Sequence, residues 1–289
     1  MDEHDHAKPG AQGMKVFYLP LVITLVILVL EVGGGLMTHS LALLADAGHV
    51  AGDTAGLLFA MFASWLALRP ADEARTYGYH RVEVLAALAN GALLFLVIGL
   101  ILRDAVGRLA APPMVDAGLM TTIAAIGLVG NLLAAASLYR YMNESLNVRG
   151  AYLHVLSDAL GSVGALAAGI LVKVTGRSEF DAVASMLICV VVAISSFSLV
   201  RDSVHILLEG VPSHLDLETV RKALCGLGGV SEVHDLHLWS LSSGSESLTV
   251  HLVVPDGVDR QAVLDAGTEM LDAKFGLHHV TLQIEAPKQ

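Results

Sequence analysis

Long stretches of apolar residues, separated by short polar breaks, fill the first two-thirds of the chain. A membrane-spanning helix needs about 20 consecutive, mostly apolar residues. The pattern predicts six such helices, at about Val16–Leu36, Leu41–Leu68, Val82–Val106, Leu119–Tyr139, Ala151–Val174 and Phe180–Val200. We therefore expect an all-α transmembrane domain of six helices, the second of which carries a polar face.

The pattern changes beyond residue 204 to that of a small soluble α+β domain. Apolar residues at helical spacing cover His214–Gly226 and Asp259–Phe275. Strand-like alternation covers Val233–Leu241, Leu248–Pro255 and Val280–Ala286. The sequence thus predicts a flexible N-terminus at residues 1–15, a transmembrane domain at 16–204 and a C-terminal domain at 205–289.

Composition supports a membrane protein. Hydrophobic residues make up 54% of the chain, the mean hydropathy is +0.65, and only 16% of the residues are charged, against about 25% in soluble domains. The net charge of −11 argues against nucleic-acid binding, which needs a basic face. A surplus of carboxylates would suit a protein that handles cations, although such groups are more often solvated surface.

Basic residues predict the orientation, because they concentrate in cytoplasmic loops. With the N-terminus inside, the inner loops hold Lys8, Lys15, Arg69, Arg75, Arg81, Arg140, Arg149 and Arg201, and the outer loops hold Arg103, Arg108, Lys173 and Arg177. Six spans return the C-terminal domain to the cytoplasm. The chain has two cysteines and no disulfide framework, which agrees with a domain in the reducing cytoplasm. The first apolar run is too long for the apolar region of a signal peptide. We expect the protein to lie in the inner membrane.

Ionisable residues interrupt two of the apolar segments, where they are costly and usually functional. The second segment carries Asp46, His49 and Asp53, and the fifth carries His154 and Asp158. Both segments contain His-x-x-x-Asp, a spacing that places the two side chains one turn apart on the same helix face. The repetition in separate segments favours one joint site over ordinary hydrogen bonding within the bundle.

Two imidazoles and two carboxylates form the nitrogen and oxygen ligand set of a tetrahedral zinc site. No cysteine or methionine is placed to favour copper(I), and an all-oxygen set would suit magnesium or calcium better. Glu31, Asn90 and Asn131 are expected to form hydrogen bonds between helices. Glu31 or Asn131 could instead line an ion path.

Four motifs along the chain resemble those of the cation diffusion facilitator family, in its cobalt-zinc-cadmium resistance and zinc-exporter branch. They are Leu44-Ala-Asp-Ala-Gly-His49-Val-Ala-Gly-Asp53, Thr76-Tyr-Gly-Tyr-His80-Arg-Val-Glu83, Gly150-Ala-Tyr-Leu-His154-Val-Leu-Ser-Asp158 and Val233-His-Asp-Leu-His237-Leu-Trp239-Ser. They occur in the order that the family shows, and the resemblance covers almost the whole chain.

The resemblance implies six transmembrane helices, a cytoplasmic metallochaperone-like αββαβ domain, a homodimer and proton-coupled export of zinc, with cadmium or cobalt as further substrates. His49, Asp53, His154 and Asp158 match the family's transport site. Arg81 and Glu209 match a charge interlock near the membrane surface. The resemblance implies a transporter that is not an enzyme and has no cofactor, with zinc as substrate and as a candidate structural or regulatory ligand.

The resemblance also implies cytoplasmic metal sites. His234, His251, His278 and Glu285 fall where the family places them, and His80 falls at an interface site. Ordinary surface residues are an equally good reading of these positions. His237 is expected to be structural, in a buried strand.

Zinc needs neutral imidazoles and ionised carboxylates, so protons compete with it for the same side chains. This competition would couple zinc export to proton entry. Two rival functions remain: an intramembrane metalloenzyme, for which no His-Glu-x-x-His motif or nucleophile is evident, and a zinc receptor or partner subunit that does not transport. The sequence does not rank zinc against cadmium, cobalt or nickel.

Overall fold

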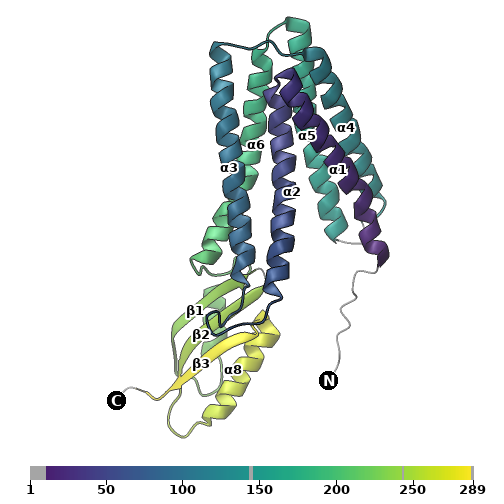
Figure 1. Cartoon of the computed structure of the whole chain (residues 1–289). Helices are drawn as coiled ribbons and strands as arrows, with labels where there is room; N and C mark the ends of the chain where they lie inside the picture. The colour runs from purple at the N-terminus through teal and green to yellow at the C-terminus, as the bar shows by residue number, and fades with distance from the viewer. Residues whose placement is uncertain (1–10, 143–145, 243, 288–289) are drawn as a thin grey trace. The chain divides into compact units, whose positions relative to one another are not determined.

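A computed structural model of the protein describes residues 11–142, 146–242 and 244–287. Within these residues the chain forms eight helices and three strands (Figure 1). The helices are α1 (Ala11–Thr38), α2 (Leu41–Ala67), α3 (Arg81–Ala110), α4 (Ala117–Tyr139), α5 (Leu146–Thr175), α6 (Glu179–Leu207), α7 (Leu217–Cys225) and α8 (Arg260–Phe275). The strands are β1 (Glu232–Ser242), β2 (Ser245–Val253) and β3 (His279–Glu285).

Helices α1 to α6 are the six helices of the described chain that are long and apolar enough to cross a membrane. Large apolar side chains such as Val29 and Ile194 are mostly exposed on them, as lipid-facing residues are. The six predicted spans are therefore confirmed, with small shifts at the ends. Helix α1 begins at Ala11, within the N-terminal segment expected to be flexible, and α6 continues to Leu207 instead of ending at Val200. The predicted domain boundaries at residues 15 and 204 stay predictions.

The described residues divide into two compact units, and the first contains residues 11–57 and 90–197. In this unit α4 packs along both α1 and α5 (Figure 1). Its core is formed by buried apolar side chains from several helices, including Leu43, Met120 and Ile188. Glycines allow the helices to approach closely, because a methyl group at Gly52 would collide with Leu94. The ionisable residues of α2 and α5 lie within this unit.

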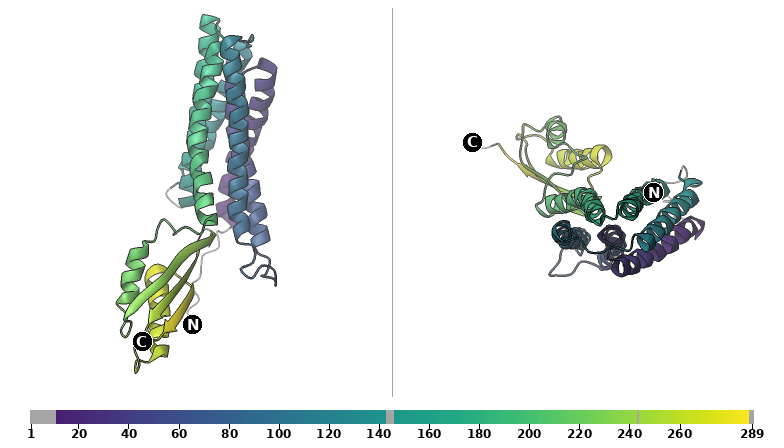
Figure 2. Two further views of the ribbon diagram at one scale, coloured as in Figure 1. Left: turned by 90° about the vertical axis from the view of Figure 1, so that its left-hand side faces the viewer. Right: turned by 90° about the horizontal axis from the view of Figure 1, so that it is seen from above.

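The second unit contains residues 58–89 and 198–287, with the soluble domain as its larger part. Its sheet has the order β1-β2-β3, with β1 antiparallel and β3 parallel to β2. Helix α7 packs against β1 and α8 against β3, over a core that includes Leu224, Leu248 and Leu271 (Figure 2). This arrangement confirms the predicted αββαβ fold. Helix α7 begins three residues later than expected because Asp216 caps its N-terminus.

The polar segment that joins α2 to α3 is held by its own side chains. Asp72 accepts hydrogen bonds from the Arg75 guanidinium at 3.3 Å and from the Tyr79 hydroxyl at 3.1 Å. At the start of α3, Arg81 forms an ion pair of 2.9 Å with Glu209, which follows α6. The residues matched to the family's charge interlock are therefore in direct contact.

Candidate metal sites

The two His-x-x-x-Asp pairs of α2 and α5 face one another inside the first unit. His49 Nδ1 lies 3.6 Å from Asp53 Oδ2, and His49 Nε2 lies 3.6 Å from Asp158 Oδ1. His154 Nε2 lies 3.4 Å from Asp53 Oδ2 and 3.9 Å from Asp158 Oδ2. Two pairs of side chains, more than 100 residues apart in sequence, thus converge from two helices.

The separations suit a tetrahedral zinc ion. Zinc bonds to nitrogen and oxygen of about 2.1 Å place neighbouring ligand atoms about 3.4 Å apart. Ligand atoms of His49, Asp53 and Asp158 all lie within 4.8 Å of one another, and His154 contacts both carboxylates. His49 Nδ1, Asp53 Oδ2 and Asp158 Oδ1 are buried without a hydrogen-bond partner among the described residues. Buried polar atoms of this kind are costly unless a ligand satisfies them.

Two cavities border these four side chains on different sides. One, of about 470 Å³, reaches Asp53, His154 and Asp158 from between α1, α2, α4 and α5. The other, of about 380 Å³, reaches His49 and Asp46 from between α2, α5 and α6. An ion could thus approach the ligand atoms through more than one opening of the bundle.

Asp46 lies one turn before His49 but belongs to a different set of contacts. Its Oδ2 accepts a hydrogen bond of 3.1 Å from the Ser162 hydroxyl. Ser162 in turn accepts one of 3.2 Å from the Asn131 side chain, so the expected hydrogen bonding of Asn131 between helices is present. The sequence places Asp46 on nearly the same helix face as His49. Only the packing of α2 against α5 shows that Asp46 hydrogen-bonds to Ser162, whereas His49 joins the candidate metal site.

A second cluster lies on the sheet of the soluble domain. His234 Nε2 lies 3.2 Å from Glu285 Oε2, and His251 Nδ1 lies 2.9 Å from Glu285 Oε1. The three residues offer ligand atoms within 4.8 Å of one another. They meet because β1 pairs His234 with His251, and β3 brings Glu285 beside them at the other edge of β2.

Electrostatics at this cluster favour the ionised carboxylate. Partial burial alone would raise the pKa of Glu285, but a hydrogen bond from Gln283 and the neighbouring His251 and His234 outweigh it, so that the pKa is lowered. A carboxylate that stays ionised beside two imidazoles is suited to binding a divalent cation.

Asp235 is a further residue of this cluster, which the sequence analysis missed. Its Oδ2 lies 3.6 Å from His251 Nε2, and its Oδ1 lies 3.0 Å from His237 Nε2. The strand register shifts between His234 and His237, and Asp235 has a φ of 50°. This irregularity turns the Asp235 side chain toward His251, and simple alternation along the strand does not predict it. His237 lies in β1 as expected, but its side chain faces away from the buried side of the strand and is exposed, so it has no structural role in the core.

Two other predicted ligands lie apart from both clusters. His278 Nδ1 lies 2.7 Å from Asp272 Oδ1 and is mostly exposed. His80 lines a small cavity of about 280 Å³ with Tyr77 and Leu241. Within the part of the chain that the structure describes, neither joins a group of three side chains that could hold a metal. Metal binding at these two positions stays a prediction.

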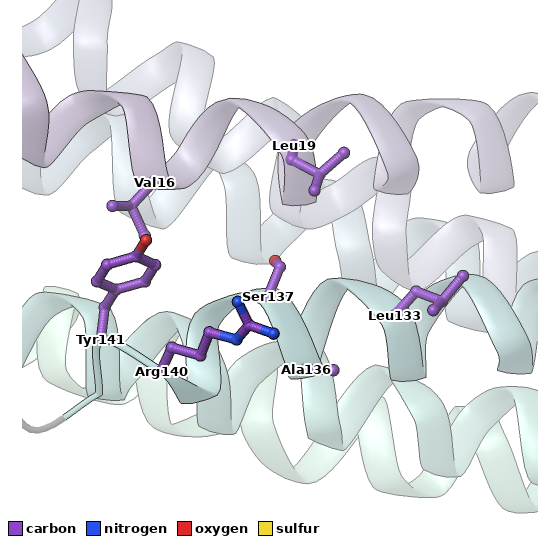
Figure 3. Close-up of a pocket in the computed structure, with 7 residues that line it drawn as sticks. All are labelled: Val16, Leu19, Leu133, Ala136, Ser137, Arg140 and Tyr141. Atoms are coloured by element: carbon purple, nitrogen blue, oxygen red, sulfur yellow. The ribbon is translucent and has the colours of Figure 1, made fainter.

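A larger groove, of about 700 Å³, lies between the start of α1 and the end of α4 (Figure 3). Val16, Leu19 and Leu133 line its apolar part, and Ser137, Arg140 and Tyr141 line its polar end. No histidine or carboxylate borders it among the described residues, and its one charged side chain is a cation. Despite its size, this groove is therefore no candidate for a metal site.

Comparison with known proteins identifies the family. The model of the cation efflux transmembrane domain matches residues 18–208, and that of the cation efflux protein cytoplasmic domain matches residues 212–287. The chain belongs to the cation efflux family. The resemblance inferred from the four motifs is thereby confirmed.

Similar proteins match nearly the full chain. The metal cation efflux system protein CzcD of Cupriavidus metallidurans is 43% identical over 98% of this chain and 89% of its own. The cadmium, cobalt and zinc/H(+)-K(+) antiporter of Bacillus subtilis is 40% identical, over 98% and 91%. The zinc transporter ZitB of Escherichia coli is 38% identical, over 91% and 84%.

One solved structure is also similar in sequence. The metal-bound C-terminal domain of the CzcD transporter from Cupriavidus metallidurans is 42% identical, covering 25% of this chain and 99% of that one, with a TM-score of 0.23. The family, the six spans and the small α+β domain together establish a multi-pass membrane protein of the cation efflux type.

Proposed function

We propose that this protein is a proton-coupled antiporter that exports zinc from the cytoplasm, with cadmium and cobalt as further substrates. The convergence of His49, Asp53, His154 and Asp158, with ligand atoms 3.4 to 3.9 Å apart, carries the proposal. The names of the relatives, which include zinc, cadmium and cobalt transport and proton antiport, support it. Zinc is then a substrate that passes through the site.

The same four side chains supply the proton coupling. Zinc binds ionised carboxylates and neutral imidazoles, whereas protons bind all four groups when zinc leaves. When the site faces the cytoplasm, zinc displaces protons, and when it faces the other side, protons displace zinc. A change of access by movement of α2 and α5 against the other helices would complete the cycle.

A second metal would bind in the cytoplasmic domain at His234, His251 and Glu285. Asp235 lies beside the other ring nitrogen of His251 and would orient that ring. We further propose a homodimer in the inner membrane, with both termini in the cytoplasm. The match to the cytoplasmic domain of cation efflux proteins supports this assembly. Metal at the sheet could bias the dimer between two arrangements and so adjust transport.

The decisive experiment is zinc flux into proteoliposomes under an imposed pH gradient. The wild type, Asp158→Ala and a control, Asp104→Asn, are compared, because Asp104 is an exposed carboxylate of α3 paired with Arg108. We expect zinc movement to follow the proton gradient in the wild type and the control and to vanish in Asp158→Ala. Flux that persists in Asp158→Ala would refute the ligand set.

The two rival functions predict other results. A receptor or partner subunit would bind zinc but give no flux as folded wild type. A metalloenzyme would hydrolyse a membrane substrate, which assays of the purified protein with lipid and peptide substrates would detect. The four available protein ligands favour transport, because catalytic zinc usually keeps three and an open position.

A further inference from the structure

Two carboxyl groups that the proposed zinc site does not use are buried together at the centre of the first unit. Glu31 of α1 and Asp46 of α2 are each 1% exposed. They border the same hydroxyl, because Glu31 Oε1 and Ser162 Oγ both lie beside Gly127, and Ser162 Oγ lies 3.1 Å from Asp46 Oδ2. Both oxygens of Glu31 and Oδ1 of Asp46 have no hydrogen-bond donor among the described residues. Two ionised carboxylates in such a place would repel one another strongly and would lack solvation.

The surrounding helices fit the pair closely and supply no compensating cation. A methyl group on Gly127 would lie 2.7 Å from Glu31 Oε1, and one on Gly161 would collide with Asp46 Oδ1. Glycines at these positions of α4 and α5 therefore leave room for the carboxyl groups. No lysine or arginine contacts either carboxyl within the described residues.

The hydrogen bonds around the pair distinguish its two members. Asn131 donates to Ser162, and Ser162 donates to Asp46 Oδ2, so this chain of donors supports a negative charge on Asp46. Glu31 receives no such donor. One proton on Glu31, donated to the free Asp46 Oδ1, would satisfy both groups at once, as in other carboxyl pairs that share a proton.

The pair is close enough to the zinc ligands to respond to their charge. Asp46 lies three residues before His49 on α2, about 5 to 6 Å away along the helix surface. The titratable groups that face the pair are His49 on α2 and Asp158 on α5, whereas α4 contributes only the neutral Asn131. The cavity of about 380 Å³ that borders His49 also borders Asp46, and it extends to Phe180 at the start of α6.

We propose that Glu31 carries an exchangeable proton, shared with Asp46, which leaves when zinc binds at the neighbouring site and returns when zinc departs. The arriving dication repels the proton, which transfers to water in the cavity beside Asp46, and both carboxylates then face the positive charge. This proton is additional to those displaced from the four zinc ligands. The inference rests on the proposed zinc transport and adds a separate proton carrier to it.

The test counts the protons released when zinc binds to the purified full-length protein, by calorimetry in buffers of different ionisation enthalpy. Glu31→Gln keeps the shape of the side chain but has no proton to release. We therefore expect this variant to bind zinc while releasing about one proton fewer per protomer than the wild type. Glu31→Asp, which keeps a carboxyl group, should release as many protons as the wild type. Glu179→Gln, a partly exposed acid at the start of α6 that pairs with Arg177, is the matched control and should also behave as the wild type.

A second measurement decides the question even if Glu31→Gln fails to fold. Infrared difference spectra of the wild type should show a protonated carboxyl band that disappears on zinc binding. Absence of that band, or full proton release by folded Glu31→Gln, would overturn the proposal. Both readouts concern binding in detergent, so a wild type that binds zinc but transports none would refute the proposed function and leave this inference to be decided separately.

Discussion

Asp181, in the first turn of α6, accepts a hydrogen bond of 2.7 Å from the backbone N–H of Leu41, the first residue of α2. Its other oxygen accepts hydrogen bonds from the Ala42 N–H at 3.1 Å and the Ser40 hydroxyl at 2.6 Å. The first N–H groups of a helix have no partner within the helix, so a carboxylate from elsewhere can accept hydrogen bonds from them. Its negative charge also interacts favourably with the positive end of the helix dipole. Asp181 thus fixes the start of the helix that carries His49 and Asp53.

Replacement of Asp181 by alanine should destabilise the transmembrane unit. It would leave two backbone donors and a hydroxyl buried without partners, which costs at least about 2 kcal/mol. We expect a lower thermal midpoint in detergent for Asp181→Ala and a smaller decrease for Asp181→Asn, which keeps one acceptor oxygen. Glu179→Gln, two residues earlier and partly exposed, serves as the control. Equal midpoints for Asp181→Ala and this control would contradict the capping role.

A second capping carboxylate, Asp216, predicts a pH dependence in the soluble domain. Hydrogen bonds from the Thr219 hydroxyl and the Thr219 backbone N–H lower the pKa of Asp216 from its usual value of 3.8. A lowered pKa stabilises the fold above the unfolded-state pKa, and this stabilisation is lost as the pH falls through the folded-state pKa. Asp216→Ala should therefore lower the urea midpoint at pH 7, and the difference from the wild type should shrink below pH 3.8.

The measurement uses Trp239 fluorescence in a Trp65→Phe background, because these are the two tryptophans of the chain. Glu269→Ala removes an exposed acid on α8 and is the control. A difference between Asp216→Ala and the wild type that persists unchanged in acid would show that the charge of Asp216 is not responsible.

The four residues of the proposed zinc site could be predicted from sequence because the geometry within each pair is local. His49 and Asp53 share a helix face whatever the fold, and so do His154 and Asp158. The only information that the sequence lacked was that α2 and α5 are in contact. The long apolar runs fixed the six spans for the same reason, since length and hydropathy are properties of each segment alone.

Contacts that depend on packing between distant segments could not be predicted. Asp181 and Leu41 are 140 residues apart, and nothing in either segment indicates the other. Asp46 and His49 look equivalent on a helical projection, yet Ser162 and Asn131 draw Asp46 into a separate network. Asp235 was missed because an irregular strand register, which alternation does not reveal, turns it toward His251.

The ion pair between Arg81 and Glu209 should contribute little to stability. Both side chains are well exposed, at 40% and 61%, so water screens the attraction at their separation of 2.9 Å. A double-mutant cycle with Arg81→Met and Glu209→Gln, read from thermal unfolding, should give a coupling of less than about 1 kcal/mol. A coupling several times larger would mean that the pair is desolvated in the assembled protein.

The two histidines of the proposed transport site should determine its preference for zinc. His49→Asp together with His154→Asp would create an all-carboxylate site, which suits harder cations such as manganese better than zinc. We expect the ratio of zinc to manganese affinity, measured by calorimetry, to fall by about tenfold or more. His39→Asn is the control, because asparagine tolerates the positive φ of 57° at that position. An unchanged ratio would show that the imidazoles do not bind the metal.

Two glycines on α5, three residues apart, give the sharpest test of the packing around Asp46. A methyl group on Gly161 would collide with Asp46 Oδ1, whereas one on Gly164 would meet Ile188 Cδ1 at 3.8 Å, an ordinary contact. Gly161→Ala must therefore displace Asp46 or separate α5 from α2, and either change would disturb the four converging ligands. We expect Gly161→Ala to reduce zinc flux at least about tenfold, because small misplacements of a site are costly.

Gly164→Ala introduces the same methyl group on the same helix and should retain flux, with equal or higher thermal stability because alanine favours the helix. The comparison removes the general effect of a glycine replacement in α5. Equal flux in the two variants would mean that α2 can move away from α5 without loss of function. A decrease confined to Gly161→Ala would tie transport to the close approach of Asp46.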